Sequence, residues 1–140
     1  MKRLLLLLFI PILSYSQISY KDVMSINSVN MFKKVLIENS WRNTNYKKDK
    51  KLHYRWFNES GNINIDGWYY IEEGKFDFLF LDRQLGFDSI WDEIKKKCVF
   101  FDVIDDFVCY DCSQSKYKGV IGFKTMNESY WGVIEQFPIK

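Results

Sequence analysis

Histidine and proline are rare in this sequence. His53 is the only histidine, and Pro11 and Pro138 are the only prolines. One histidine cannot form an H-E-x-x-H zinc motif, and the chain also lacks the G-x-S-x-G and phosphate-loop motifs. No linker rich in proline, glycine or serine divides the chain. We therefore expect a single domain, and nothing points to an enzyme of these classes.

Cysteine is also scarce, and its spacing does not suit a metal. The three cysteines are Cys98, Cys109 and Cys112, and His53 is the only other soft ligand. A structural zinc site needs four ligands in paired spacings, which this set does not provide. We therefore expect neither a metal nor another cofactor.

The main part of the chain has no excess of positive or of negative charge. The sequence has 20 basic and 18 acidic residues, but Lys2 and Arg3 lie at the N-terminus. Without these two, 18 basic residues face 18 acidic ones. A neutral domain carries no electrostatic footprint for nucleic acid or for an anionic membrane, so we expect neither as a partner.

The first sixteen residues have the pattern of a signal peptide. Lys2 and Arg3 precede ten almost wholly apolar residues, 4–13, and a small-x-small site ends at Ser16. Ten apolar residues are half of the about 20 that span a bilayer. We expect cleavage before Gln17, one mature domain over 17–140, a periplasmic or secreted location, and no stable membrane insertion after the leader is removed.

Hydrophobic periodicity predicts two main helices and a series of strands. Apolar residues recur every three to four positions in 28–39 and in 87–97, with Ser28 as the first N-cap and Asp88 or Ser89 as the second. An extra helical turn is expected over 21–25. The strands are expected at 52–57, 63–71, 76–81, 99–104, 107–110, 117–125 and 130–137, with a further short one near 41–46.

This order predicts an α+β fold. Consecutive strands joined by short turns favour one antiparallel sheet, here of seven or eight strands, with both helices packed on one face. The two halves suggest a tandem αββββ repeat. In 76–81 three phenylalanines share one face, and Asp77 is expected in solvent on the other face.

All three cysteines lie in a stretch that predicts a hairpin turning at Asp105-Asp106. A loop centred on Asp105 places Cys98 opposite Cys112. A two-residue loop would instead place Cys98 opposite Ser113. The length of the turn therefore decides which residues pair across the hairpin.

The first register predicts a disulfide between Cys98 and Cys112, which export permits. Cys109 is then a free, buried thiol on the core face, beside Phe101 and Phe107. The alternative is a redox C-x-x-C pair of Cys109 and Cys112. Alternation along a strand turns these two to opposite faces, and a strand offers no helix N-terminus to activate a thiol, so we favour the disulfide.

Two features of the strands suggest function. The first is an aromatic sheet face, for which the candidate residues are Trp56, Trp68, Tyr70, Tyr130 and Trp131. Since helices cover one face, we expect some of these rings on the other. There they would form a non-enzymatic surface for a protein or cell-envelope partner. Loops or a homodimer partner are the alternative cover for this face.

The second feature is a group of carboxylates on the hairpin, at Asp102, Asp105, Asp106 and Asp111. Such a group suggests a small enzyme acting on a glycan, or a cation site. The spacing matches no known ligand motif, so this hypothesis ranks second. A position close to His53 would favour it.

One resemblance concerns the whole chain. It rests on the leader end Ser-Tyr-Ser-Gln and on the run Cys98…Cys109-x-x-Cys112…Tyr117-Lys118-Gly119-x-Ile121-Gly122-Phe123. With these the chain resembles small exported proteins of flavobacteria-like (Bacteroidetes) bacteria that carry no assigned function. The resemblance implies export but no activity. The layout is also similar to the tandem αβ repeat of the β-lactamase inhibitory protein, in architecture alone.

Overall fold

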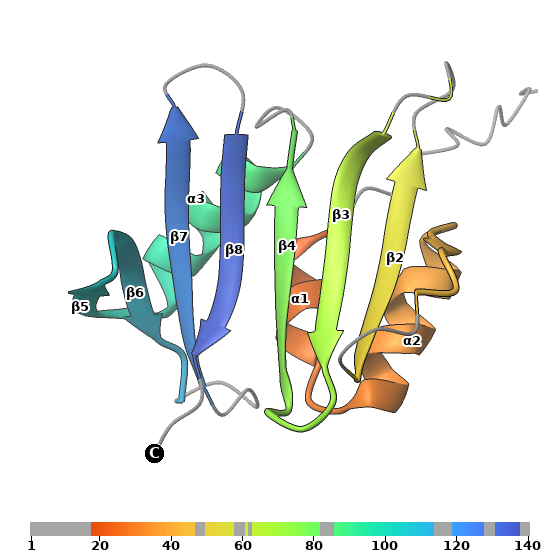
Figure 1. Ribbon diagram of the computed structural model, residues 1–140. Coiled ribbons are helices and arrows are strands. Elements are labelled where there is room, and N and C mark those ends of the chain that lie inside the picture. The colour runs from red at the N-terminus through yellow and green to blue at the C-terminus, as the bar shows by residue number, and fades with distance from the viewer. Residues whose placement is uncertain are drawn as a thin grey trace, which may run out of the picture.

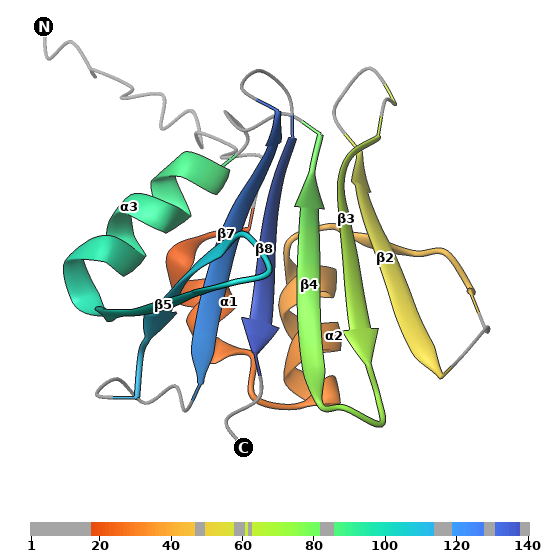
Figure 2. The same ribbon diagram turned by 60° about the vertical axis from the view of Figure 1, so that its left-hand side comes forward.

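A computed structural model describes residues 18–46, 50–57, 61, 63–81, 86–113, 119–127 and 131–137. It contains one eight-stranded antiparallel sheet with three helices behind it (Figure 1). The predicted α+β fold with a single antiparallel sheet is therefore confirmed. All three helices lie on the same side of the sheet in both views (Figure 2).

The helices are α1 (Tyr20–Ser25), α2 (Val29–Glu38) and α3 (Phe87–Lys97). The strands are β1 (Arg42–Asn43), β2 (Lys51–Phe57), β3 (Ile63–Tyr70), β4 (Lys75–Phe80), β5 (Val99–Ile104), β6 (Phe107–Asp111), β7 (Val120–Asn127) and β8 (Trp131–Phe137). Both main helices lie where periodicity predicts them. The extra helical turn expected near residue 21 is the third helix, α1.

The strand order divides the sheet into two matching halves. It runs β1-β2-β3-β4-β8-β7-β6-β5, so four strands follow α2, four follow α3, and the last strand of each half meets the other at the centre. There Phe78 of β4 pairs with Ile134 of β8. This layout agrees with the predicted tandem αββββ repeat.

The core lies between the sheet and the helices because apolar side chains alternate along the strands. In β4, Phe76, Phe78 and Phe80 are fully buried on the helix side. Phe32 of α2 contacts two of these rings, and Phe87 of α3 contacts the third. Each half of the sheet thus has its own helix as a cover.

The start of α2 was predicted correctly and the start of α3 was not. Ser28 caps α2 by accepting the N–H of Met31 at 3.2 Å. The helix α3 begins after Gly86, whose φ of 115° is open to glycine but strained for other residues. Asp88 and Ser89 therefore lie inside the first turn of α3 and are not its N-cap.

The β5–β6 hairpin has a two-residue turn and still brings Cys98 opposite Cys112. Asp105 and Asp106 form the turn with φ of 50° and 67°, the left-handed values that such turns require. One extra residue, Phe101, then shifts the register of β5 as a β-bulge. The predicted disulfide is confirmed, with Cα atoms 4.7 Å apart. The turn is nevertheless shorter than the loop on which that prediction was based.

The free thiol of Cys109 is buried, but not where we expected it. Asp102 lies opposite it on β5, because the turn has two residues and not three. A Cβ placed on Gly122 would lie 3.1 Å from the Cys109 Sγ and 3.0 Å from the Cβ of Phe107. Phe101 is exposed in the bulge. The contact with Phe107 is thus as predicted, while the position beside Phe101 on the core face is wrong.

Candidate functional site

The sheet has a second face, which no helix of the described chain covers (Figure 2). We call it the open face. Its side chains alternate with those of the core along β2, β3 and β4. The strand registers place His53 beside Trp68, and Trp68 beside Asp77. Aromatic and ionisable side chains are therefore neighbours across three strands.

The sequence offered five aromatic residues as candidates for this face, and the structure gives them different positions. Trp68 and Tyr70 lie on the open face, half-buried. Trp56 is 7% exposed and belongs to the core, so its predicted role is wrong. The error arises because both faces of β2 and β3 carry aromatic residues. Tyr130 and the side chain of Trp131 lie outside the described residues.

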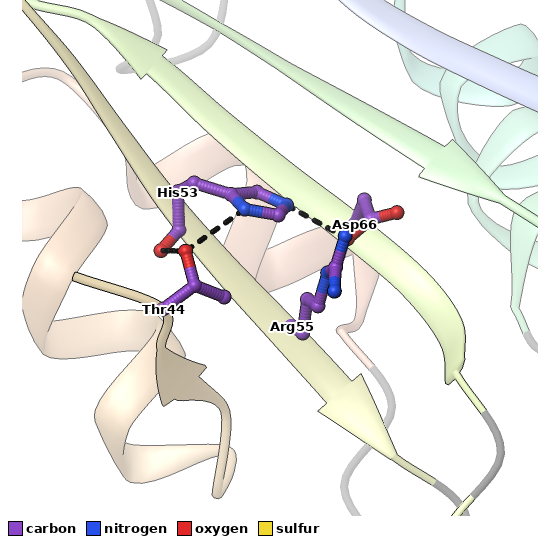
Figure 3. A network of polar contacts seen from close by, with 4 residues as sticks. All are labelled: Thr44, His53, Arg55 and Asp66. Carbon is purple, nitrogen blue, oxygen red and sulfur yellow. Dashed lines mark hydrogen bonds and ion pairs between the residues drawn. The ribbon is translucent and has the colours of Figure 1, made fainter. Parts of the chain in front are cut away.

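Thr44, His53, Arg55 and Asp66 form a polar network on the open face (Figure 3). The Nε2 atom of His53 lies 2.7 Å from Oδ1 of Asp66, and the Nε atom of Arg55 donates to the same oxygen at 2.8 Å. On the other side of the imidazole, Oγ1 of Thr44 lies 2.9 Å from Nδ1. The ring of His53 is thus held at both nitrogens.

Two aromatic rings complete this network. The indole of Trp68 lies flat on the imidazole of His53, with centroids 3.7 Å apart and planes inclined by 11°. Tyr46 meets the indole edge-on, at 5.3 Å and 89°. Because each ring packs against another, these side chains hold one another in fixed positions on the open face.

The protonation of His53 follows from its burial. It is 3% exposed, and burial lowers its pKa, although the hydrogen bond to Asp66 acts in the opposite direction. The ring is therefore neutral at neutral pH, so that Nε2–H donates to Asp66 and Nδ1 accepts from the hydroxyl of Thr44.

Hydroxyl, imidazole and carboxylate stand here in the order of a hydrolytic triad. Two features oppose proton transfer through them. Burial disfavours the imidazolium of His53, and Arg55 already binds the oxygen of Asp66 that would stabilise it. We therefore interpret these residues as a positioning network that supports Trp68.

Asp77 lies at the centre of the open face. It stands opposite Trp68 on β3 and Glu135 on β8, and the hydroxyl of Tyr70 donates to its Oδ2 at 2.7 Å. Burial is the main cause that raises the pKa of Asp77 to about 6; Glu135 contributes, and the bond from Tyr70 opposes the shift. Lys75 lies 3.3 Å from Glu135. A carboxylate whose ionised form destabilises the folded protein is typical of functional positions.

We expect Asp77→Asn to stabilise the protein at about pH 8, by roughly 2 kcal/mol, and to change little at about pH 4. The pKa of Asp77 is about 6 in the folded protein and near 3.8 in the unfolded chain. Above both values the ionised carboxylate penalises the folded state. As pH falls through 6, the folded protein binds the proton first and the wild type regains stability. Urea unfolding at both pH values measures the difference.

Titrating groups that do not interact with Asp77, such as His53, contribute equally to both proteins and cancel in this comparison. A gain in the free energy of unfolding that is equal at both pH values would contradict burial of an ionised Asp77. A loss at the higher pH would contradict it as well.

Three of the four hairpin aspartates are engaged locally through their side chains. Asp106 pairs with Lys124 at 3.6 Å, while Asp102 and Asp111 each accept a nearby backbone N–H. His53 lies on β2, near the other edge of the sheet (Figure 1). Among the described residues, no three His, Cys, Asp or Glu side chains are grouped as a metal ion would need.

Three comparisons bear on this chain. No protein-family model, no curated protein and no solved structure matches it. In the part that the structure describes, no helix is long and apolar enough to cross a membrane. The function is therefore inferred from the geometry of the open face alone.

Sequence reasoning missed Tyr46, Thr44 and Asp66 as members of the site. The first two lie in a stretch with no clear pattern. Asp66 lies inside β3, which runs on through Gly67 to Tyr70, and a Cβ on Gly67 would lie 2.9 Å from the ring of Phe78. The alternation of side chains along the strand of His53 was the one signal in the sequence that pointed to this site. It gives the face of a residue but not its cross-strand partner.

Proposed function

We propose that this chain is an exported, non-enzymatic binding domain that contacts a protein or cell-envelope partner through the open face. The observation that carries the proposal is the interlocked group of Tyr46, His53, Arg55, Asp66 and Trp68. Aromatic rings and an arginine are the side chains that contribute most at binding interfaces. Here they stand on a rigid sheet.

Preorganisation supports this proposal. A partner that meets ordered side chains loses less conformational entropy at the interface than one that must order them. Trp68 is fixed by His53 beneath it, and Arg55 is fixed by Asp66. Tyr46 and Arg55 remain accessible at the rim, at 39% and 38%. These two can contact a partner with little rearrangement.

Centrally placed Asp77 adds a second argument. Its ionised form penalises folding at neutral pH, yet its neighbours Tyr70 and Lys75 arrange hydrogen-bonding groups around it. A partner that donates a hydrogen bond to this carboxylate would relieve the penalty. The stability lost by ionising Asp77 is then recovered as a polar contact at the middle of the open face.

The proposal is tested by capture from a cell-envelope extract of the source organism on the immobilised protein. Tyr46→Ala and Arg55→Ala are each expected to weaken capture of the same partner about tenfold or more, since interface aromatics and arginines carry most of the binding energy. Both side chains are half exposed, so the fold should persist.

The matched control is Ile37→Ala, which removes an exposed apolar side chain from α2 on the other side of the sheet. It should leave capture unchanged. Protease treatment of the extract distinguishes a protein partner from a polysaccharide. Equal capture by all variants, or loss with Ile37→Ala alone, would overturn the proposal.

A further inference from the structure

Strand β5 forms one edge of the sheet and carries an exposed apolar surface. Val99, Phe100, Phe101 and Val103 are each between 55% and 60% exposed. An edge strand also presents backbone N–H and C=O groups on its outer side, which can pair with a further strand. Exposed apolar side chains on such an edge mark a site of association.

The opposite edge is built differently. There β1 has only two residues, Arg42 and Asn43, and both are polar and exposed. A very short edge strand with a charged side chain is a usual protection against pairing between sheets. With six residues and mostly apolar side chains, β5 lacks that protection. Only one of the two edges of the described sheet is therefore suited to association.

The two ends of β5 carry opposite charge. Lys95, Lys96 and Lys97 are exposed at the end of α3, directly before the strand, and Asp105 and Asp106 are exposed in the turn after it. When two copies of β5 lie antiparallel, the basic end of each is beside the acidic end of the other. We propose that this chain forms a two-fold dimer by antiparallel pairing of β5 with β5 of a second copy.

The bulge selects the register of this dimer. Because Phe101 is the extra residue, Phe100 and Val103 lie on the same side of the sheet, the helix side. Residues opposite one another in an antiparallel pair share a face. Phe100 therefore pairs with Val103 of the second copy, and Val99 with Ile104 of the second copy. Both copies then have their helices on the same side of one continuous sheet.

Asp102 restrains the association. Its Oδ1 accepts the backbone N–H of Val103 at 2.7 Å, so this donor is occupied in the monomer. In the dimer the two Asp102 side chains approach the two-fold axis, where like charges repel. The dimer is therefore weak and reversible. It leaves the open face uncovered and does not compete with the partner proposed above.

Sedimentation equilibrium of the purified protein over a wide concentration range tests the dimer. The wild type is expected to shift from monomer to dimer as its concentration rises. Val103→Lys should weaken dimerisation at least tenfold. The control Met126→Lys changes an equally exposed apolar residue on β7, 58% exposed, and should not weaken it. Asp102→Asn should strengthen dimerisation severalfold.

Three results would overturn the dimer. One is a wild type that stays monomeric at every concentration. Another is a Val103→Lys variant that dimerises as well as the wild type while circular dichroism shows it folded. The third is dissociation by Tyr46→Ala, which would place the contact on the open face. Val103→Lys is expected to capture the envelope partner as the wild type does. A failure of the dimer and a failure of the proposed function can therefore be told apart.

Discussion

Phe78→Ala is expected to lower the free energy of unfolding by about 3–5 kcal/mol. Phe78 is fully buried in β4, at the centre of the sheet. Its ring contacts Phe32 at 5.9 Å, Trp41 at 5.7 Å and Phe76 at 5.3 Å between centroids. Removing it leaves a cavity between α2 and the sheet that these neighbours cannot fill, because each is held by other contacts.

Urea unfolding followed by tryptophan fluorescence measures this loss. Phe78→Leu is the matched control, because it retains most of the apolar volume and should lose clearly less stability. A loss below about 1 kcal/mol for Phe78→Ala would mean that the site collapses, and would contradict the tight packing around Gly67.

Reduction of the Cys98–Cys112 disulfide is expected to lower the free energy of unfolding by roughly 2–4 kcal/mol. The bond joins residues 14 apart in sequence and ties the end of α3 to both strands of the hairpin. Without it the open end of the hairpin is held by backbone pairing and by the contacts of Tyr110 with Phe100 and Trp91. Thermal unfolding with and without reductant measures the effect.

The double variant Cys98→Ala/Cys112→Ala is the control. It should unfold like the reduced wild type, and reductant should not change its stability. Cys109 should react with iodoacetamide only when the protein unfolds, because its thiol is buried. Rapid alkylation of the folded protein, or equal stability with and without reductant, would contradict these assignments.

The parts of the fold that follow one local pattern were predictable. Alternation placed Phe76, Phe78 and Phe80 on one face of β4 and Asp77 on the other. Three-to-four spacing located α2 and α3, and turn residues marked the hairpin. In each case one periodicity determines which face is buried, and no long-range contact is needed to decide it.

The parts that depend on pairing between strands were not predictable. Trp56 and Trp68 lie in strands whose two faces are both aromatic, so alternation separates the faces without saying which one the helices cover. A two-residue turn alone would place Cys98 opposite Ser113. The bulge at Phe101 restores the pairing of Cys98 with Cys112. No local signal in the sequence marks that bulge, because it is a property of how β5 pairs with β6.

The candidate site shows the same limit. Asp77 was correctly placed on the face away from the phenylalanines, but it was expected in solvent. Its partial burial results from Tyr70 and Glu135, which belong to two different neighbouring strands. A raised pKa of this kind depends on cross-sheet packing, which the order of residues along one strand does not contain.

The position of β8 has a consequence for how the chain folds during synthesis. β8 comes last among the described strands, yet it lies between β4 and β7. Until residues 131–137 leave the ribosome, the two halves cannot join and each has a bare inner edge. The β4–β8 pairing joins segments far apart in the sequence, whereas the other strand pairs of the described sheet are consecutive in the chain. We expect this pairing to form last, because closing a long loop costs more conformational entropy than closing a hairpin.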